Sequence, residues 1–167
     1  KWKRELQQKG LSKASLLMQC TDPDVFKIPE KNERVENEVL FVGNSRGIYR
    51  KIIKDMLPTE YNISIYGKGW KDLIDNKHIK GEHIENKDLY KYYGGAKIVL
   101  NDHWDDMREK GFVSNRIFDV LACGGKIITD KVDGSSLFQN SNYIHSYYSE
   151  SELSNLVEQM LHNSTTE

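Results

Sequence analysis

The sequence is poor in cysteine, with only Cys20 and Cys123 among its 167 residues. They lie far apart, in neither the spacing of a metal site nor the dense pattern of a disulfide scaffold. The simplest interpretation is a reducing compartment. No run of apolar residues is long enough to cross a bilayer, and no signal-peptide pattern is present. We therefore expect a cytoplasmic protein without a structural metal site.

The sequence also lacks an excess of charge of either sign. It contains 24 basic and 25 acidic residues, for a formal net charge of −1. A nucleic-acid-binding domain usually concentrates basic residues on one face, so this balance argues against nucleic acid as a partner. A near-neutral domain can still bind phosphate locally, so the charge balance does not exclude a nucleotide ligand. The length predicts about one domain, and a hydrophobic fraction of 38% is ordinary for a soluble fold.

The first part of the chain differs in composition from the rest. Residues 1–36 hold two of the three prolines, many charges and a single short apolar run. We expect this segment to be an interdomain linker or lead-in, followed by one domain over 37–162 and a tail over 163–167. Because the first residue is lysine and not methionine, we also expect the chain to be part of a longer protein.

From residue 38 onward, short apolar runs alternate with segments of helical periodicity. Strands are expected at 39–42, 62–66, 78–80, 97–100, 126–129 and 142–145. Helices are expected at 48–57, through 73–74, at 88–93, at 114–123 and from Ser149 onward. This alternation predicts βαβ units and an α/β fold, namely a Rossmann-like parallel sheet with helices on both faces. Such sheets bind ligands beyond the carboxyl ends of their strands, at the switch point in strand order.

Glycine-rich loops come directly after the first two expected strands. Residues 43–47 (GNSRG) lack the GxGxxG fingerprint of dinucleotide-binding folds. Asn44 and Arg46 could hold a phosphate near a helix start, but the segment could equally be a plain strand-to-helix turn. Gly67 and Gly69 would let the chain turn sharply beside a ligand, and here too an ordinary turn is the alternative.

The most informative segment is 111–125, GFVSNRIFDVLACGG. Its glycine-led loop enters a helix whose first turn carries Ser114, Asn115 and Arg116. Free amides at a helix start, together with a guanidinium, could hold a pyrophosphate. Asp119 lies about one turn further along nearly the same face, where its carboxylate could accept hydrogen bonds from two ribose hydroxyls. The alternative is an Arg116–Asp119 pair on a solvated helix face.

Polar residues also come after the fourth expected strand, at the same edge of the sheet. His103 could act as a general acid or base, or contact a phosphate. Asp102, Asp105 and Asp106 leave room for a divalent cation, although none is required. The alternative interpretation of this segment is a solvated acidic loop.

The order of these motifs resembles the C-terminal domain of GT-B glycosyltransferases, specifically the CgeB-like branch of the "glycosyl transferases group 1". The matching segments are FVG at 41–43, IYGKG at 65–69, DLYKYY at 88–93, AKIVLN at 96–101 and RIFDVLACG at 116–124. The resemblance covers roughly residues 37–140. It implies the C-terminal half of a GT-B fold, in a bacterial enzyme of polysaccharide biosynthesis.

The resemblance implies that this domain binds a nucleotide-diphosphate sugar as the donor of a hexosyltransferase-like reaction. Asp119 would hold the ribose, residues 111–116 the diphosphate, and Ile84 the base. Arg116 and His103 would be the catalytic residues, with Arg116 neutralising the leaving diphosphate. No tightly bound cofactor is implied. A missing N-terminal domain would hold the acceptor, a glycan, lipid or protein, so we expect this part to be inactive alone. The full-length protein could be peripheral to a membrane.

One departure from the family pattern keeps an alternative function open. Many relatives carry two glutamates eight residues apart around this loop. Here the second is Asp119 and the first falls at Gly111, with Glu109 out of register. The alternative is therefore a degenerate, non-catalytic module that binds a nucleotide or sugar. A receiver-like domain is disfavoured, because Gly43 and Gly67 stand where its acidic residues would be needed.

Overall fold

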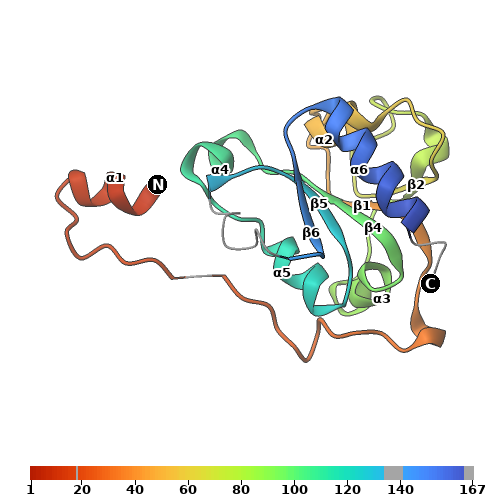
Figure 1. Ribbon diagram of the computed structural model, residues 1–167, viewed down its shortest axis with the longest axis horizontal. Helices are drawn as coiled ribbons and strands as arrows, with labels where there is room; N and C mark the ends of the chain where they lie inside the picture. Colours follow the sequence, from red (N-terminus) through yellow and green to blue (C-terminus); the bar gives the residue numbers. More distant parts are fainter. Residues whose placement is uncertain (18, 134–140, 164–167) are drawn as a thin grey trace.

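The computed structural model describes residues 1–17, 19–133 and 141–163 (Figure 1). Residues 164–167 of the expected tail and the last part of the family-like segment, 134–140, lie outside the described residues. The core is a six-stranded sheet of order β3-β2-β1-β4-β5-β6, in which every pairing is parallel. Its strands are β1 (Asn37–Val42), β2 (Ile63–Tyr66), β3 (Ile79–Gly81), β4 (Ala96–Asn101), β5 (Ile127–Asp130) and β6 (Ile144–Tyr147). The predicted Rossmann-like α/β fold is confirmed.

Consecutive residues of the central strands are buried on both faces of the sheet. Val39, Leu40 and Phe41 of β1 are each 0% exposed, and the three central residues of β4 are equally inaccessible. Successive side chains of a strand point to opposite faces. An unbroken apolar run therefore requires cover on both sides, which is the situation of a parallel sheet between helices.

Two pairs of helices supply this cover. On one face lie α2 (Lys51–Met56) and α6 (Glu150–Asn163), whose apolar residues share a core with Phe41. On the other face lie α3 (Leu89–Tyr93) and α5 (Asn115–Ala122), which pack with Leu40. Figure 1 shows the two pairs on opposite sides of the sheet. The expectation of helices on both faces is thus confirmed. Among the described residues, no helix combines the length and the apolar character that a membrane span requires.

Several local expectations are corrected by the structure. The helix expected at 48–57 begins only at Lys51, because Ser45–Ile48 forms a tight turn with positive φ angles of 55° at Arg46 and 75° at Gly47. The helix expected through residues 73–74 is wrong. Leu73 and Ile74 form a single turn bonded to the Trp70 carbonyl, after which the chain enters β3 through the 3₁₀ helix η2 (Asn76–His78).

Two short helices were not predicted, α1 (Trp2–Gln8) and α4 (Asp105–Lys110). Neither contains a buried residue, so neither carries the apolar periodicity by which a helix is found in a sequence. The segment before the sheet also contains η1 (Lys31–Glu33), and η3 (Asn86–Asp88) leads into α3. Both 3₁₀ helices thus lie in connecting segments, η1 before β1 and η3 before α3.

Part of the expected lead-in, residues 1–36, packs on the domain. Phe26 is 8% exposed and stacks on Tyr93 with ring centroids 6.3 Å apart. Pro29 lies so close to Gly94 that a Cβ there would be 2.3 Å from the proline Cδ. Figure 1 shows this segment running along the α5 and α3 side of the domain. The later part of this segment therefore has a defined position beside the end of α3.

Candidate functional site

The order of strands reverses between β1 and β4. From β1 the chain builds outward through β2 and β3, and from β4 it builds in the opposite direction through β5 and β6. The loops after β1 and β4 consequently diverge, and this switch point is where open α/β sheets bind ligands. The side chains directly after these two strands form the candidate site.

The loops after β1 and β2 are joined by a set of hydrogen bonds. The Ser45 amide donates to the Lys68 carbonyl at 3.0 Å, and the Lys68 amide donates to Asn44 Oδ1 at 2.8 Å. The buried Ser45 hydroxyl donates to the Gly69 carbonyl at 2.5 Å. The side-chain carbonyl of Asn44, a predicted ligand contact, is thus used to shape the loop.

Glycine is required where these loops touch. Gly67 has a φ of 148°, and a Cβ on it would lie 2.2 Å from the Gly43 carbonyl oxygen. No other residue fits such an approach. Gly67 and Gly69 also line a cavity of about 410 Å³, whose other wall includes Gly81 and Glu82 after β3. Ile84, the residue expected near a base, comes just after this wall and is 9% exposed.

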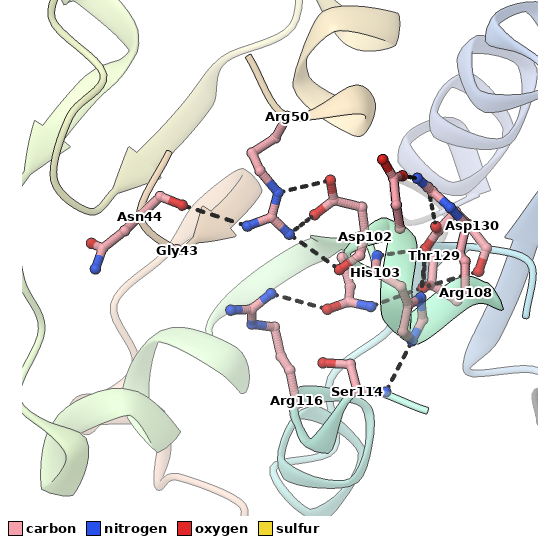
Figure 2. A network of polar contacts seen from close by, with 12 residues as sticks. Gly43, Asn44, Arg50, Asp102, His103, Arg108, Ser114, Arg116, Thr129 and Asp130 are labelled. Carbon is pink, nitrogen blue, oxygen red and sulfur yellow. Dashed lines mark hydrogen bonds and ion pairs between the residues drawn. The ribbon is translucent and has the colours of Figure 1, made fainter. Parts of the chain in front are cut away.

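A buried ion pair spans the switch point. Arg50, which precedes α2, donates from Nε to Asp102 Oδ2 at 3.0 Å and pairs through Nη2 with Oδ1 (Figure 2). Their side chains are only 8% and 3% exposed. Nη1 of Arg50 reaches the Asn44 carbonyl at 3.5 Å, so one guanidinium connects the loops after β1 and β4. Burial raises the pKa of Asp102, and Arg50 opposes that shift.

The indole ring of Trp104 contacts the guanidiniums of both Arg50 and Arg46. The Arg50 guanidinium carbon is 4.0 Å from the indole centroid, and that of Arg46 is 5.1 Å away. Both distances are those of cation–π contacts. Arg46, a predicted phosphate contact, is exposed to solvent and lies against the Trp104 ring.

The acidic residues after β4 do not gather into a metal site. Asp102 is occupied by Arg50, and Asp105 pairs with Arg108 across the first turn of α4. In the part of the chain that the structure describes, no three His, Cys, Asp or Glu side chains are grouped so that they could hold a metal ion. The carboxylates of Asp102 and Asp105 instead neutralise neighbouring arginines.

His103 is a buried link between β5 and the start of α5. It is 2% exposed, and its Nδ1 lies 2.6 Å from Asp130 Oδ1. The Ser114 amide donates to its Nε2 at 2.9 Å. Asp130 also accepts a hydrogen bond from Arg108 at 2.9 Å. Both ring nitrogens thus make contacts within the protein. The series of contacts runs from Arg108 through Asp130 and His103 to Ser114, the residue before α5 (Figure 2).

This geometry determines which ring nitrogen of His103 carries hydrogen. Because a backbone amide donates to Nε2, that nitrogen is an acceptor, and the hydrogen is on Nδ1, facing Asp130. We expect a long-range ¹H–¹⁵N correlation spectrum at neutral pH to show His103 as a single Nδ1–H tautomer. His83, with 67% of its side chain exposed, is the internal reference for an exposed ring. A protonated Nε2 on His103 would contradict the arrangement.

Arg116 enters the site from α5, and among the described residues its hydrogen bonds go to uncharged groups. Its Nη1 donates to Asn101 Oδ1 at 3.0 Å, and its guanidinium lies 5.7 Å from the Phe41 ring centroid. Burial raises the pKa of Tyr93, and the nearby Arg116 opposes that rise. Nη2 of Arg116 is close to Gly43, where a Cβ would be 3.5 Å away.

The Nε of Arg116 is buried and has no hydrogen-bond partner among the described residues. No carboxylate within the described ranges forms an ion pair with this guanidinium, whereas Arg50 pairs with Asp102 and Arg108 with both Asp105 and Asp130. Asp102 and Asp119 are near enough for Arg116 to oppose the rise of their pKa, but neither carboxylate forms an ion pair with it. The guanidinium lies at the switch point, near the loops after β1 and β4.

Asp119 is 8% exposed and lies one turn further into α5. Asn115 donates from Nδ2 to both carboxylate oxygens at 3.2 Å, and the Thr21 hydroxyl donates to Oδ1 at 2.7 Å. Burial is the largest cause of the raised pKa of Asp119, and the bonds from Thr21 and Asn115 oppose it. The ion pair between Arg116 and Asp119 on a solvated helix face, the alternative interpretation of this motif, is not formed.

Several residues of this arrangement were not predicted as site residues. Arg50, Asn101, Asp130 and Thr21 each act through a partner distant in sequence. A single arginine before a short helix, or a threonine in a polar segment, carries no periodic signal. Only the position of Asn101 and Asp130 at strand ends could have pointed to them.

The sequence model of the family described as "Glycosyl transferase-like" matches residues 46–166. The chain belongs to this family. The match begins in the loop after β1 and includes α5, so the site lies almost entirely within it. The resemblance to a glycosyltransferase, drawn from motif order, is confirmed, and the chain is of the glycosyltransferase type.

The chain is also similar in sequence to a curated protein. The spore protein CgeB of Bacillus subtilis (strain 168) is 25% identical to the glycosyl transferase-like chain over 122 residues. The aligned region covers 64% of this chain and 38% of the relative. The chain therefore spans well under half the length of this CgeB protein.

Proposed function

We propose that the domain formed by residues 37–162 binds the nucleotide-diphosphate sugar donor of a glycosyltransferase, with the diphosphate on Arg116. The observation that carries the proposal is the state of this guanidinium, which has neutral contacts and an unpartnered, buried Nε within the described residues. A diphosphate supplies both the negative charge and the several acceptor oxygens that a guanidinium can bind in pairs. Family membership makes a sugar donor the natural source of that diphosphate.

The start of α5 adds to the attraction for an anion. The first amides of a helix have no partner within the helix, and the helix dipole places partial positive charge there. His103 accepts the hydrogen bond of the Ser114 amide, and we propose that the next amides of α5 face the anion. His103 and Asp130 then act by orienting this helix end.

The same arrangement can assist transfer of the sugar. When the bond between sugar and diphosphate breaks, negative charge builds up on the leaving phosphate. A guanidinium and backbone amides already in place stabilise that charge without reorganising. The reaction therefore needs no metal ion in this proposal, although a magnesium-bound donor remains compatible with it.

The placement of the rest of the nucleotide rests on the positions of the remaining residues. Asp119, one turn along α5, would accept hydrogen bonds from the ribose, and the cavity between the loops after β2 and β3 would take the base, with Ile84 following in the chain. Because the chain spans 38% of CgeB, we propose that the acceptor is held by a domain outside residues 1–167. Turnover by this chain alone should accordingly be slight.

The alternative of a binding module without catalysis has one structural observation in its favour. Gly111, which stands where relatives carry a glutamate, ends α4 with a φ of 74°. A glutamate there would be strained, because side-chain-bearing residues rarely adopt that conformation. Donor hydrolysis by the full-length protein separates an enzyme from such a module.

Titration calorimetry with UDP, GDP, ADP and CDP, with and without magnesium, tests the proposed function. We expect one diphosphate to bind selectively and its affinity to fall as salt rises, because the contact is charged. The corresponding nucleosides, without phosphate, are the matched controls and should bind far more weakly. Failure of all four diphosphates to bind would contradict the proposal for this chain.

A further inference from the structure

A hydroxyl from the segment before the sheet lies on the carboxylate of Asp119. Thr21 Oγ1 donates to Asp119 Oδ1 at 2.7 Å, although the two residues are 98 positions apart in the chain. This bond is shorter than the two bonds of 3.2 Å that Asn115 makes to the same carboxylate. Thr21 therefore makes the shortest of these three hydrogen bonds to the residue proposed to hold the ribose.

The position of Thr21 is determined by the next residues of the chain. The Asp22 carbonyl accepts hydrogen bonds from Val25 at 3.2 Å and Phe26 at 2.8 Å, which closes a turn. Phe26 is buried against Tyr93, a neighbour of Arg116. An aromatic anchor five residues away, with a turn between, holds Thr21 beside α5. The contact with Asp119 is thus built into the packing of this segment.

The hydrogen-bonding capacity of this pair is only partly used. An ionised carboxylate has about four lone-pair directions, and a hydroxyl has one donor and two acceptor positions. Thr21 spends its one donor on Oδ1, so its oxygen can only accept from a ligand. Oδ2 of Asp119 accepts only the long bond from Asn115 among the described residues. Two acceptors therefore remain on this hydrogen-bonded pair, Oδ2 of Asp119 and Oγ1 of Thr21.

We propose that Thr21 is a specificity-determining residue of the nucleotide site, which together with Asp119 recognises the vicinal diol of a ribose. One ribose hydroxyl donates to Asp119 Oδ2, and the adjacent hydroxyl donates to Thr21 Oγ1. The inference rests on the proposed function. It goes beyond it by requiring a residue from the segment before the sheet, and by predicting discrimination against a deoxyribose.

The chemistry of the two acceptors supports a diol over a single hydroxyl. A ribose carries two O–H donors on neighbouring carbons, whereas a deoxyribose leaves one of the two protein acceptors without a donor. An acceptor left without its bond costs about tenfold in affinity. Discrimination between the two sugars should therefore depend on the Thr21 hydroxyl for one position and on Asp119 for the other.

The test uses residues 1–167 and the nucleoside diphosphate, among UDP, GDP, ADP and CDP, that the wild-type chain binds most tightly. Its 2′-deoxy and 3′-deoxy forms are titrated against wild type, Thr21→Val and Thr21→Ser. We expect wild type to bind each deoxy form about tenfold more weakly than the ribose form. Thr21→Val should bind the ribose form about tenfold more weakly and lose discrimination against one deoxy form only.

Thr21→Ser keeps the hydroxyl and is expected to restore wild-type affinity and discrimination. Thr21 is half-buried in an irregular segment, so the valine variant should fold, and an unchanged melting temperature checks this. Tighter binding by Thr21→Val would overturn the inference, because Thr21 would then compete with the ligand for Asp119. Unchanged discrimination in the valine variant would overturn it as well.

Failure of this inference is distinguishable from failure of the proposed function. If wild type binds a diphosphate and Thr21→Val discriminates as wild type does, only the role of Thr21 is wrong. If wild type binds none of the four diphosphates, the proposed function and the inference are both overturned for this chain.

Discussion

Arg116→Ala is expected to reduce the affinity for the bound nucleoside diphosphate by about 100-fold or more, because it removes the charged partner of the phosphates. In the free chain this guanidinium forms no ion pair among the described residues, so its loss deprives no carboxylate there of an ion-pair partner. We therefore expect the melting temperature without ligand to change little. Calorimetric titration and thermal unfolding together measure both effects.

Two further variants make the result specific. Arg116→Lys keeps the charge but loses the planar fork, and intermediate affinity is expected. Arg34→Ala removes the same charge from the position after η1, away from the switch point, and should bind as wild type does. Wild-type affinity in Arg116→Ala would refute the proposed diphosphate contact. A large loss of stability in that variant would instead indicate a structural role for the guanidinium.

Asp102→Ala is expected to lower the free energy of unfolding by about 3–5 kcal/mol. The substitution leaves Arg50, whose side chain is 8% exposed, as a buried cation without its carboxylate. It also removes the link between the loops after β1 and β4, where Arg50 contacts Asn44 and Asp102 together. Urea denaturation at pH 7, monitored by circular dichroism, measures the change.

The double variant Arg50→Met with Asp102→Leu separates the loss of the pair from the cost of an unpaired charge. Burial raises the pKa of Asp102 above its usual value. The stability contributed by this carboxyl is therefore present below its ordinary pKa and is lost as the pH rises through the raised value. The ion pair is thus costly to form at pH 7, and the apolar pair should recover most of the stability lost in Asp102→Ala.

Recovery of stability need not restore binding. The Arg50–Asp102 pair orients the loops on both sides of the switch point, and an apolar pair lacks the directional contact with the Asn44 carbonyl. A double variant as unstable as Asp102→Ala would show that the loss comes from packing around Trp104 and not from an unpaired charge.

The strands and the main helices were predictable because their signal is local. The unbroken apolar run of β1 reflects a strand buried on both faces. The spacing of Leu153, Val157 and Met160 in α6 reflects a helix buried on one face. The short elements were not predictable for the same reason. α1 and α4 contain no buried residue, and the turn at Arg46 uses a left-handed conformation that arginine seldom adopts.

The residues of the candidate site also divide into those that the sequence indicates and those that it does not. Arg116 and Asp119 could be singled out because a glycine-led loop, a helix start and a family-like motif stand together in the sequence. Their surroundings could not be, since the Asn101 amide, the Asp130 carboxylate and the Thr21 hydroxyl come from distant segments. His103 shows the limit clearly. Its place after β4 suggested proton transfer, while the folded chain uses both ring nitrogens to hold the start of α5.

The sequence by itself determined that the chain forms an α/β fold, and where along it the polar loops come after the strands, because both depend on patterns within a few residues. Only the tertiary structure decided which charges are neutralised. Arg50, Arg108 and Arg116 are alike in the sequence, yet carboxylates from distant segments reach two of them and, among the described residues, not the third. The strand order brings these segments together at the switch point, and so it determines which arginine is left without an ion pair among the described residues.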